Sequence, residues 1–216
     1  MSEYWDQFYG KQGRRSSPPS TFAVKAIPWI KNANLKRVLD LGCGDGVDAV
    51  LFAENGCDVV CTDFSKEAIK KACKNALKRK VKIKALVHDM TEPLQFSNES
   101  FDVVFAHLSL HYFDDKTTAK IFSEITRILK IGGLLFVKVK SIDDPLYGKG
   151  EKVGENTFKF GYARHFFSQK YLLRITKQYE TIYLQQVCEE THYAVKEVSP
   201  TSVFLEYIGK KTGMKS

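Results

Sequence analysis

Short apolar segments alternate with helical patterns along most of this chain, and this alternation limits the fold more than any other feature of the sequence. Segments rich in Val, Ile, Leu and Phe predict strands at 37–41, 58–62, 82–88, 101–106, 134–140, 181–189 and 202–209. Apolar residues at helical spacing predict helices at 22–32, 47–55, 65–80, 115–130 and 168–176. A strand that leads through a helix into the next strand forms a right-handed crossover, so the first five strands are expected to lie parallel in one sheet.

The order and character of the strands predict an α/β fold with helices on both faces of the sheet. Four of the first five strands are apolar along their length, which is typical of strands covered on both sides. Residues 191–201 separate the last two strands and leave no room for a crossover helix, so those strands are expected to form an antiparallel hairpin. We therefore predict a single Rossmann-like domain over residues 1–216, with a mostly parallel seven-stranded sheet and an antiparallel C-terminal hairpin.

The composition of the chain is consistent with a single globular domain and predicts where in the cell the protein resides. The chain has 216 residues, 44% of them hydrophobic, and a domain of this size folds without disulfides or a metal. Its five cysteines are odd in number and form no Cys-x-x-Cys pair, so we predict no metal site. The sequence holds no apolar run of membrane-spanning length and begins without the regions of a signal peptide. We expect a cytoplasmic protein without a membrane partner, and its oligomeric state stays open.

Two segments carry many aromatic residues outside the predicted strands. Residues 1–34 include Tyr4, Trp5 and Tyr9, whose rings either cover a site or strap the terminus onto the core. Residues 141–167 mix glycines with Tyr and Phe and show no pattern of a helix or strand. Long segments of this kind are often functional, so 141–167 is predicted as a lid over a pocket, with a mobile surface excursion as the alternative.

The net charge of +8 is concentrated in one place. Residues 66–84 hold a run of Lys and Arg that only Glu67 opposes. On a helix, Lys66, Lys70, Lys74 and Lys78 lie one turn apart, an arrangement that slightly destabilises the helix. This basic stripe is either a solvated helix face or a surface for RNA, a nucleotide or an anionic substrate.

A glycine-rich turn joins the first strand to the following helix. Its sequence, Asp-Leu-Gly-Cys-Gly-Asp-Gly-Val-Asp over residues 40–48, lets the backbone turn tightly and lets a ligand approach main-chain atoms. Dinucleotide-binding folds place a third glycine where Val47 stands here. Asp40, Asp45 and Asp48 add negative charge that a pyrophosphate would not tolerate. The turn therefore favours a zwitterion or a cation over a diphosphate.

The second strand ends in an acid followed by an aromatic residue. A carboxylate at Asp63 can accept hydrogen bonds from both hydroxyls of a ribose, and Phe64 can pack on a purine, although Asp63 could equally cap the next helix. A glycine turn and a strand-end acid in this order together point to a ligand that contains a nucleoside.

These motifs resemble the class I methyltransferases that use S-adenosylmethionine. In that family a glycine loop surrounds the methionine part of the cofactor, and it is matched here by Asp40, Gly42, Gly44 and Gly46. Asp89-Met90 resembles the family's position that contacts the edge of the adenine ring. Residues 129–135 match a helix-turn-strand motif in which Ile131 replaces the usual proline. The resemblance implies S-adenosylmethionine as cofactor, S-adenosylhomocysteine as product, and these cofactor-binding residues: Tyr9, Asp40, Gly42, Cys43, Gly44, Asp63, Phe64, Asp89, Met90 and Ala106.

The segment after the fourth strand narrows the acceptor class. It lacks the Asn/Asp-Pro-Pro-Tyr motif of amino-methylating DNA and protein-glutamine enzymes, and no Pro-Cys nucleophile occurs in the chain. Its Leu-His-Tyr-Phe sequence at 110–113 resembles small-molecule methyltransferases of the tellurite-resistance-like and biosynthetic type. We therefore expect methyl transfer to a small-molecule acceptor. An RNA or nucleotide methyltransferase that uses residues 66–84, and a non-catalytic domain that senses S-adenosylmethionine, are the alternatives.

Candidate residues for the acceptor side follow from the same segment and from 141–167. His111 is expected on a loop at the carboxyl edge of the sheet, where an imidazole could remove or orient an acceptor proton; the alternative is a histidine that ties the loop to a carbonyl. The weaker substrate candidates are Tyr112, Tyr147, Arg164 and His165.

Overall fold

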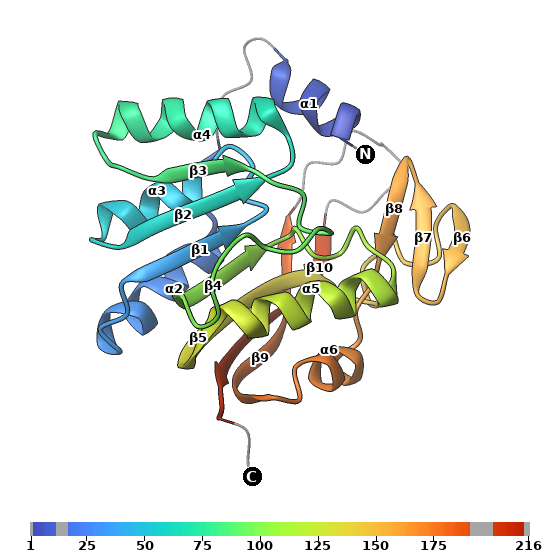
Figure 1. Ribbon diagram of the computed structural model, residues 1–216. Coiled ribbons are helices and arrows are strands. Elements are labelled where there is room, and N and C mark those ends of the chain that lie inside the picture. Colours follow the sequence, from blue (N-terminus) through green and yellow to red (C-terminus); the bar gives the residue numbers. More distant parts are fainter. Residues whose placement is uncertain (1, 12–16, 191–200, 214–216) are drawn as a thin grey trace.

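The computed structural model describes residues 2–11, 17–190 and 201–213, and its largest element is a seven-stranded sheet (Figure 1). The strand order is β3-β2-β1-β4-β5-β10-β9. The strands are β1 (Arg37–Leu41), β2 (Asp58–Asp63), β3 (Lys84–Val87), β4 (Phe101–His107), β5 (Leu129–Lys140), β9 (Tyr179–Glu190) and β10 (Thr201–Lys211). Neighbouring strands are parallel from β3 to β5, and β10 runs antiparallel to both β5 and β9. The predicted sheet and its C-terminal hairpin are confirmed; residues 191–200, which join the hairpin strands, lie outside the described residues.

Helices cover both faces of this sheet (Figure 1). They are α1 (Ser2–Gly10), α2 (Thr21–Asn32), α3 (Val47–Glu54), α4 (Lys66–Arg79), α5 (Asp115–Ile128) and α6 (Gln169–Ile175). Strand β4 shows why its sequence is apolar throughout: Val103 and Phe105 pack into the core with α2 and α3, whereas Val104 and Ala106 pack into the core with α5. Each face of the strand is buried in a different apolar core, as expected when successive side chains point to opposite sides.

Each predicted helix start lies within one residue of the observed one, and a side chain caps four of these five helices, α3 being the exception. Ser65 Oγ accepts a hydrogen bond from Ala68 N at 3.1 Å, and Asp114 Oδ1 accepts one from Thr117 N at 2.7 Å. The end of α5 differs from the prediction. The helix stops at Ile128, before Gly132 and Gly133, and β5 begins at the next residue. The glycines instead lie in β5, where its register against β4 shifts between Phe101 and Val103.

Two segments form elements that their sequence did not predict. Residues 141–167, expected to lack regular structure, contain a second sheet of three short antiparallel strands, β6 (Glu151–Gly154), β7 (Thr157–Phe160) and β8 (Tyr162–His165). The buried carboxylate of Asp144 attaches this segment to the main sheet, because Oδ2 accepts hydrogen bonds from Lys140 Nζ at 2.7 Å and from Val203 N at 2.9 Å. Near the N-terminus, α1 is the second unpredicted element, and residues 1 and 12–16 of the predicted 1–34 cover lie outside the described residues. No helix in the described ranges is long and apolar enough to cross a membrane.

Candidate functional site

A cavity of about 750 Å³ lies at the carboxyl ends of β1 to β4. This is where strand order reverses, since the chain continues from β1 toward β2 on one side while β4 lies on the other. Ligands of open α/β sheets bind at such points. Of the residues predicted for the site, the following line the cavity: Tyr9, Gly42, Cys43, Gly44, Asp63, Phe64, Asp89, Met90 and Tyr112.

The glycine turn between β1 and α3 forms one wall. The N–H groups of Gly42 and Cys43 both donate to the carbonyl of Thr62 on β2, at 2.8 and 2.9 Å, which holds the turn against the neighbouring strand. Gly44 has a φ of +55°, and a Cβ there would collide with the hydroxyl of Tyr9. A side chain at this position would therefore strain the backbone and displace α1 from the cavity.

Asp63 fixes the position of this turn. Its carboxylate accepts hydrogen bonds from Gly44 N through Oδ2 and from Ser65 N through Oδ1, both at 2.9 Å. The residue is buried, and burial raises the pKa of Asp63 even though the backbone donors favour the ionised form. One carboxylate thus holds both the glycine turn and the start of α4 beside the cavity.

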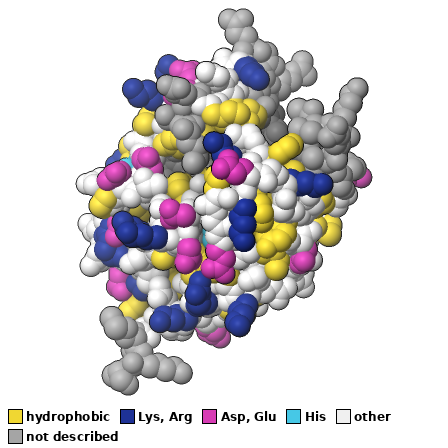
Figure 2. Space-filling view, turned by 90° about the vertical axis from the view of Figure 1, so that its right-hand side faces the viewer, with side chains coloured by type: hydrophobic (Ala, Val, Ile, Leu, Met, Phe, Trp, Pro, Cys, Tyr) yellow, Lys and Arg dark blue, Asp and Glu magenta, His cyan; other side chains and the backbone are white. Residues whose placement is uncertain are grey.

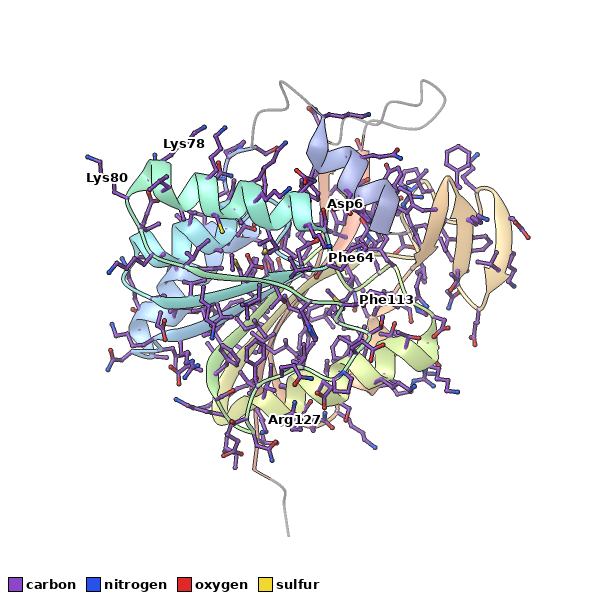
Figure 3. All side chains as sticks on the ribbon, turned by 45° about the horizontal axis from the view of Figure 1, so that its top comes forward. Asp6, Phe64, Lys78, Lys80, Phe113 and Arg127 are labelled. Carbon is purple, nitrogen blue, oxygen red and sulfur yellow. The ribbon has the colours of Figure 1, made fainter. Side chains whose placement is uncertain are left out.

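Helix α1 lies over the cavity and is attached to α4 through Asp6 (Figure 3). Asp6 Oδ1 accepts a hydrogen bond from Ser65 Oγ at 2.6 Å and a longer one from Glu67 N at 3.4 Å. The hydrogen bond from Ser65 lowers the pKa of Asp6. A carboxylate at the N-terminus of α4 also interacts favourably with the helix dipole.

Aromatic rings form the roof. Trp5 contacts Tyr112 at 5.5 Å between ring centroids and Tyr162 at 5.9 Å, while Tyr4 contacts Tyr162 at 5.2 Å. Tyr162 belongs to β8, so the 141–167 segment meets α1 through this ring. Sequence analysis did not single out Tyr162.

Asp48 and His107 line the cavity on its β4 side. Asp48 accepts hydrogen bonds from Ser20 N at 2.7 Å and Ser20 Oγ at 2.8 Å, and His107 Nδ1 lies 3.8 Å from its Oδ2. Burial and the positive charge of Lys138 lower the pKa of His107 to about 3. His107 was missed as a candidate, although it ends β4 as Asp63 ends β2, and that shared position was the signal available.

His111 lies elsewhere. It is buried, it is not among the residues that line the cavity, and its carbonyl accepts a hydrogen bond from His165 N at 2.9 Å. Burial, with the charges of Lys140 and Arg164, holds the pKa of His111 well below its usual value. These contacts fit the alternative role of His111, a histidine that supports the loop, whereas Tyr112 beside it lines the cavity.

Three other substrate candidates also lie away from the cavity lining. Tyr147 donates to Asn156 Oδ1 at 2.8 Å. The guanidinium of Arg164 lies 3.7 Å from the centroid of the Tyr162 ring, and His165 Nδ1 is 3.3 Å from Thr157 Oγ1. These side chains organise the second sheet. Two predicted cofactor residues, Asp40 and Ala106, are buried within their strands and are not part of the lining.

Comparison with known proteins identifies the kind of domain to which this cavity belongs. Residues 38–133 match the family model of a methyltransferase domain. A glycine/sarcosine N-methyltransferase of Aphanothece halophytica is 29% identical over 143 residues, which cover 65% of this chain and 52% of that protein. The chain spans about half the length of the curated relatives it matches.

Solved structures share the fold over most of the chain. TehB from Haemophilus influenzae superposes with a TM-score of 0.70 at 16% identity, covering 98% of this chain and 67% of TehB. The 1,6-didemethyltoxoflavin-N1-methyltransferase of Burkholderia thailandensis, solved with 1,6-didemethyltoxoflavin and S-adenosylhomocysteine, gives a TM-score of 0.65 at 15% identity and covers 89% of this chain and 79% of its own. At these identities the likeness concerns the fold.

We predict that His107 and His111 stay neutral in the folded protein between about pH 5 and pH 8, whereas an ordinary histidine titrates near 6.5. Unfolding would then take up protons below about pH 6.5, so the free energy of unfolding falls as the pH is lowered, by up to about 1.4 kcal/mol per pH unit for each histidine. NMR titration of the ring signals measures the pKa values. A His111→Gln variant should show a shallower loss of stability at acid pH, and a ring that titrates near 6.5 contradicts the prediction for that residue.

Proposed function

We propose that this chain, which belongs to the class I S-adenosylmethionine-dependent methyltransferase family, transfers a methyl group from S-adenosylmethionine to a small-molecule acceptor. The observation that carries the proposal is a cavity that combines the glycine turn and Asp63 with an aromatic cover formed by α1.

The β2 and β3 side of the cavity fits the cofactor. Asp63 already accepts two backbone hydrogen bonds and still faces the cavity, where its oxygens can also accept from ribose hydroxyls. Phe64 offers an apolar surface for a purine, and Asp89 lies beyond the end of β3 for its exocyclic amine. When bound, S-adenosylmethionine supplies an activated methyl group, and the chain has to align it and exclude water.

The size and the aromatic cover of the site favour a small acceptor. A volume of about 750 Å³ lies within the range of small-ligand pockets, about 300–1,000 Å³. In Figure 3, Phe64 and Phe113 lie below α1, so aromatic residues enclose the cavity from more than one side. A polymer such as RNA would have to reach the methyl group past this cover.

The basic stripe lies on α4 and at its end, and no lysine or arginine of residues 66–84 belongs to the cavity lining. Lys78 and Lys80 lie at the opposite end of α4 from Asp6 (Figure 3). Two of the basic groups have acidic partners, since Lys70 Nζ and Arg79 Nε each lie 2.6 Å from a glutamate, Glu67 and Glu54 respectively. On the side of the molecule that carries β6–β8, described basic and acidic side chains are interspersed (Figure 2). These placements favour a solvated helix face over an RNA surface.

The experiment incubates the purified protein with isotope-labelled S-adenosylmethionine and a fractionated metabolite extract, and detects labelled small molecules by mass spectrometry. We expect label in one or a few metabolites, with S-adenosylhomocysteine formed in equal amount. Label in RNA instead, with affinity that falls steeply as salt rises, would support the RNA alternative. Cofactor binding without any transfer would support the sensing alternative.

Replacing Asp63 should weaken the binding of S-adenosylhomocysteine. In Asp63→Ala, the ribose and two backbone N–H groups lose a charged acceptor, and we expect a loss of about tenfold to a hundredfold. Asp63→Asn should lose affinity as well, because its NH₂ group would face the N–H of Gly44 or Ser65, and two donors cannot form a hydrogen bond with each other. Calorimetry measures the dissociation constants, with the exposed Asp58→Asn as control. Unchanged binding by a folded Asp63→Ala protein would remove Asp63 from the site.

If α1 is a cover, its backbone should become protected when cofactor binds. Trp5, Phe8 and Tyr9 line the cavity and gain contact area from a ligand beneath them. Hydrogen exchange over residues 2–10 should slow with S-adenosylhomocysteine, and Asp6→Ala, which removes the link to Ser65, should speed exchange in both states. Equal exchange with and without ligand in the wild-type protein would favour a permanent strap.

A further inference from the structure

The lining of the cavity is acidic. Five aspartates belong to it, Asp45, Asp48, Asp63, Asp89 and Asp114, and the described lining residues include no lysine or arginine. Asp63 and Asp89 lie on the β2 and β3 side, which the proposed function assigns to the cofactor. Asp45 lies in the glycine turn, which the resemblance also assigns to the cofactor, and S-adenosylmethionine carries only one net positive charge. Asp48 and Asp114 therefore remain for the side where an acceptor would bind.

Cations close to this side are paired with other groups. Lys138 stands beside His107 in the register of β4 and β5, but its Nζ lies 2.6 Å from Glu189 Oε1 and 3.1 Å from Glu206 Oε1. The guanidinium of Arg164 lies over the Tyr162 ring and donates to the carbonyl of Phe160 at 2.9 Å. A carboxylate or phosphate on the acceptor would therefore meet negative charge without a described cation to balance it.

Asp48 is the carboxylate that the fold holds most firmly on this side. It is 7% exposed, and both of its oxygens accept hydrogen bonds from Ser20, whose hydroxyl oxygen also caps α2. Its neighbours keep it in place without neutralising it, and burial raises its pKa. Such a group is stabilised when a positive charge arrives near it.

Aromatic rings complete the environment. Trp5, Tyr9, Tyr112 and Phe113 line the same cavity. Their faces can stack on a planar molecule and attract a cation through the ring quadrupole. Carboxylates and aromatic faces together suit a flat ligand that is neutral or positively charged.

The histidine at the cavity favours an acceptor from which no proton has to be removed. His107 is the histidine of the described lining, and its pKa of about 3 makes it too weak a base to ionise a phenol or a thiol. A ring nitrogen with a free lone pair attacks without losing a proton. The N–C bond then forms as the S–C bond breaks, the bonding electrons return to sulfur, and the positive charge moves from sulfur to nitrogen.

We propose that the acceptor is an uncharged, planar nitrogen heterocycle without carboxylate or phosphate groups, and that the cavity binds its N-methylated product as a cation. This inference rests on the proposed function, because it assumes that the acceptor shares the cavity with the methyl donor. Among the carboxylates of the cavity, we assign Asp48 as the residue that determines the specificity for this acceptor.

The test uses binding and needs no turnover. Quinoline, N-methylquinolinium and quinaldate share one ring system and are neutral, cationic and anionic. Each is titrated by calorimetry into protein saturated with S-adenosylhomocysteine. We expect N-methylquinolinium to bind about tenfold or more tightly than quinoline, and quinaldate to bind most weakly.

Variants locate the effect. Asp48→Asn should reduce the preference for the cation over quinoline by about tenfold, while Asp58→Asn, the same change at an exposed position on the opposite edge of the sheet, leaves it intact. Trp5→Leu is a second variant, expected to weaken the cation more than quinoline. Quinaldate binding as tightly as the cation, or an unchanged preference in both cavity variants, overturns the inference. The titration of S-adenosylhomocysteine alone reports separately on the proposed function, and its failure would remove both proposals.

Discussion

The carboxylate of Asp63 is the interaction on which the site depends. It receives the N–H of Gly44 from the turn after β1 and the N–H of Ser65 from the start of α4. Ser65 then donates its hydroxyl to Asp6, so α1 is linked to the same point. Burying a carboxylate is costly unless hydrogen bonds compensate it, and here one donor, Gly44, comes from the turn after β1, while the other, Ser65, lies two residues further along the chain than Asp63. The shape of the turn, the start of a helix and the cover of the cavity are therefore set together.

Much of the fold could be predicted from the sequence because its main strands are buried on both faces. Strand β1 matches its predicted bounds, 37–41, and the other strands of the large sheet differ at their ends. Asp63 was found by the rule that strand ends meet at one edge of a parallel sheet, and the same rule applied to β4 would have found His107. His111 and Tyr112 are adjacent in an irregular turn, where no periodicity tells which of two neighbouring side chains faces a cavity.

The elements that sequence analysis missed depend on contacts between distant residues. Helix α1 mixes aromatic and polar residues, and its rings find partners in Tyr112 and in Tyr162 of β8. Strands β6, β7 and β8 have four residues each, too few for an alternating pattern to stand out, and glycines lie at their ends or between them. Neither segment has a helical or strand periodicity strong enough to be recognised in the sequence beside its turn-forming residues. Helix α1 lines the cavity and the second sheet packs against α1 through Tyr162, so together they form the cover that the sequence left least defined.

The distribution of charge explains why the composition of the chain says little about its ligand. The chain carries a net charge of +8, yet the described lining of its cavity contains five aspartates and no lysine or arginine. Many lysines are exposed on α4, whereas Lys138 and Lys140 are buried and bonded to acids of their own. Salt at about 0.1 M largely screens the interaction between exposed charges that are more than about 10 Å apart. Groups at the wall of a partly enclosed cavity act on a ligand at short range and with little screening. The charge that a ligand in this cavity meets at short range is therefore that of the described wall, which is opposite in sign to the charge of the whole chain.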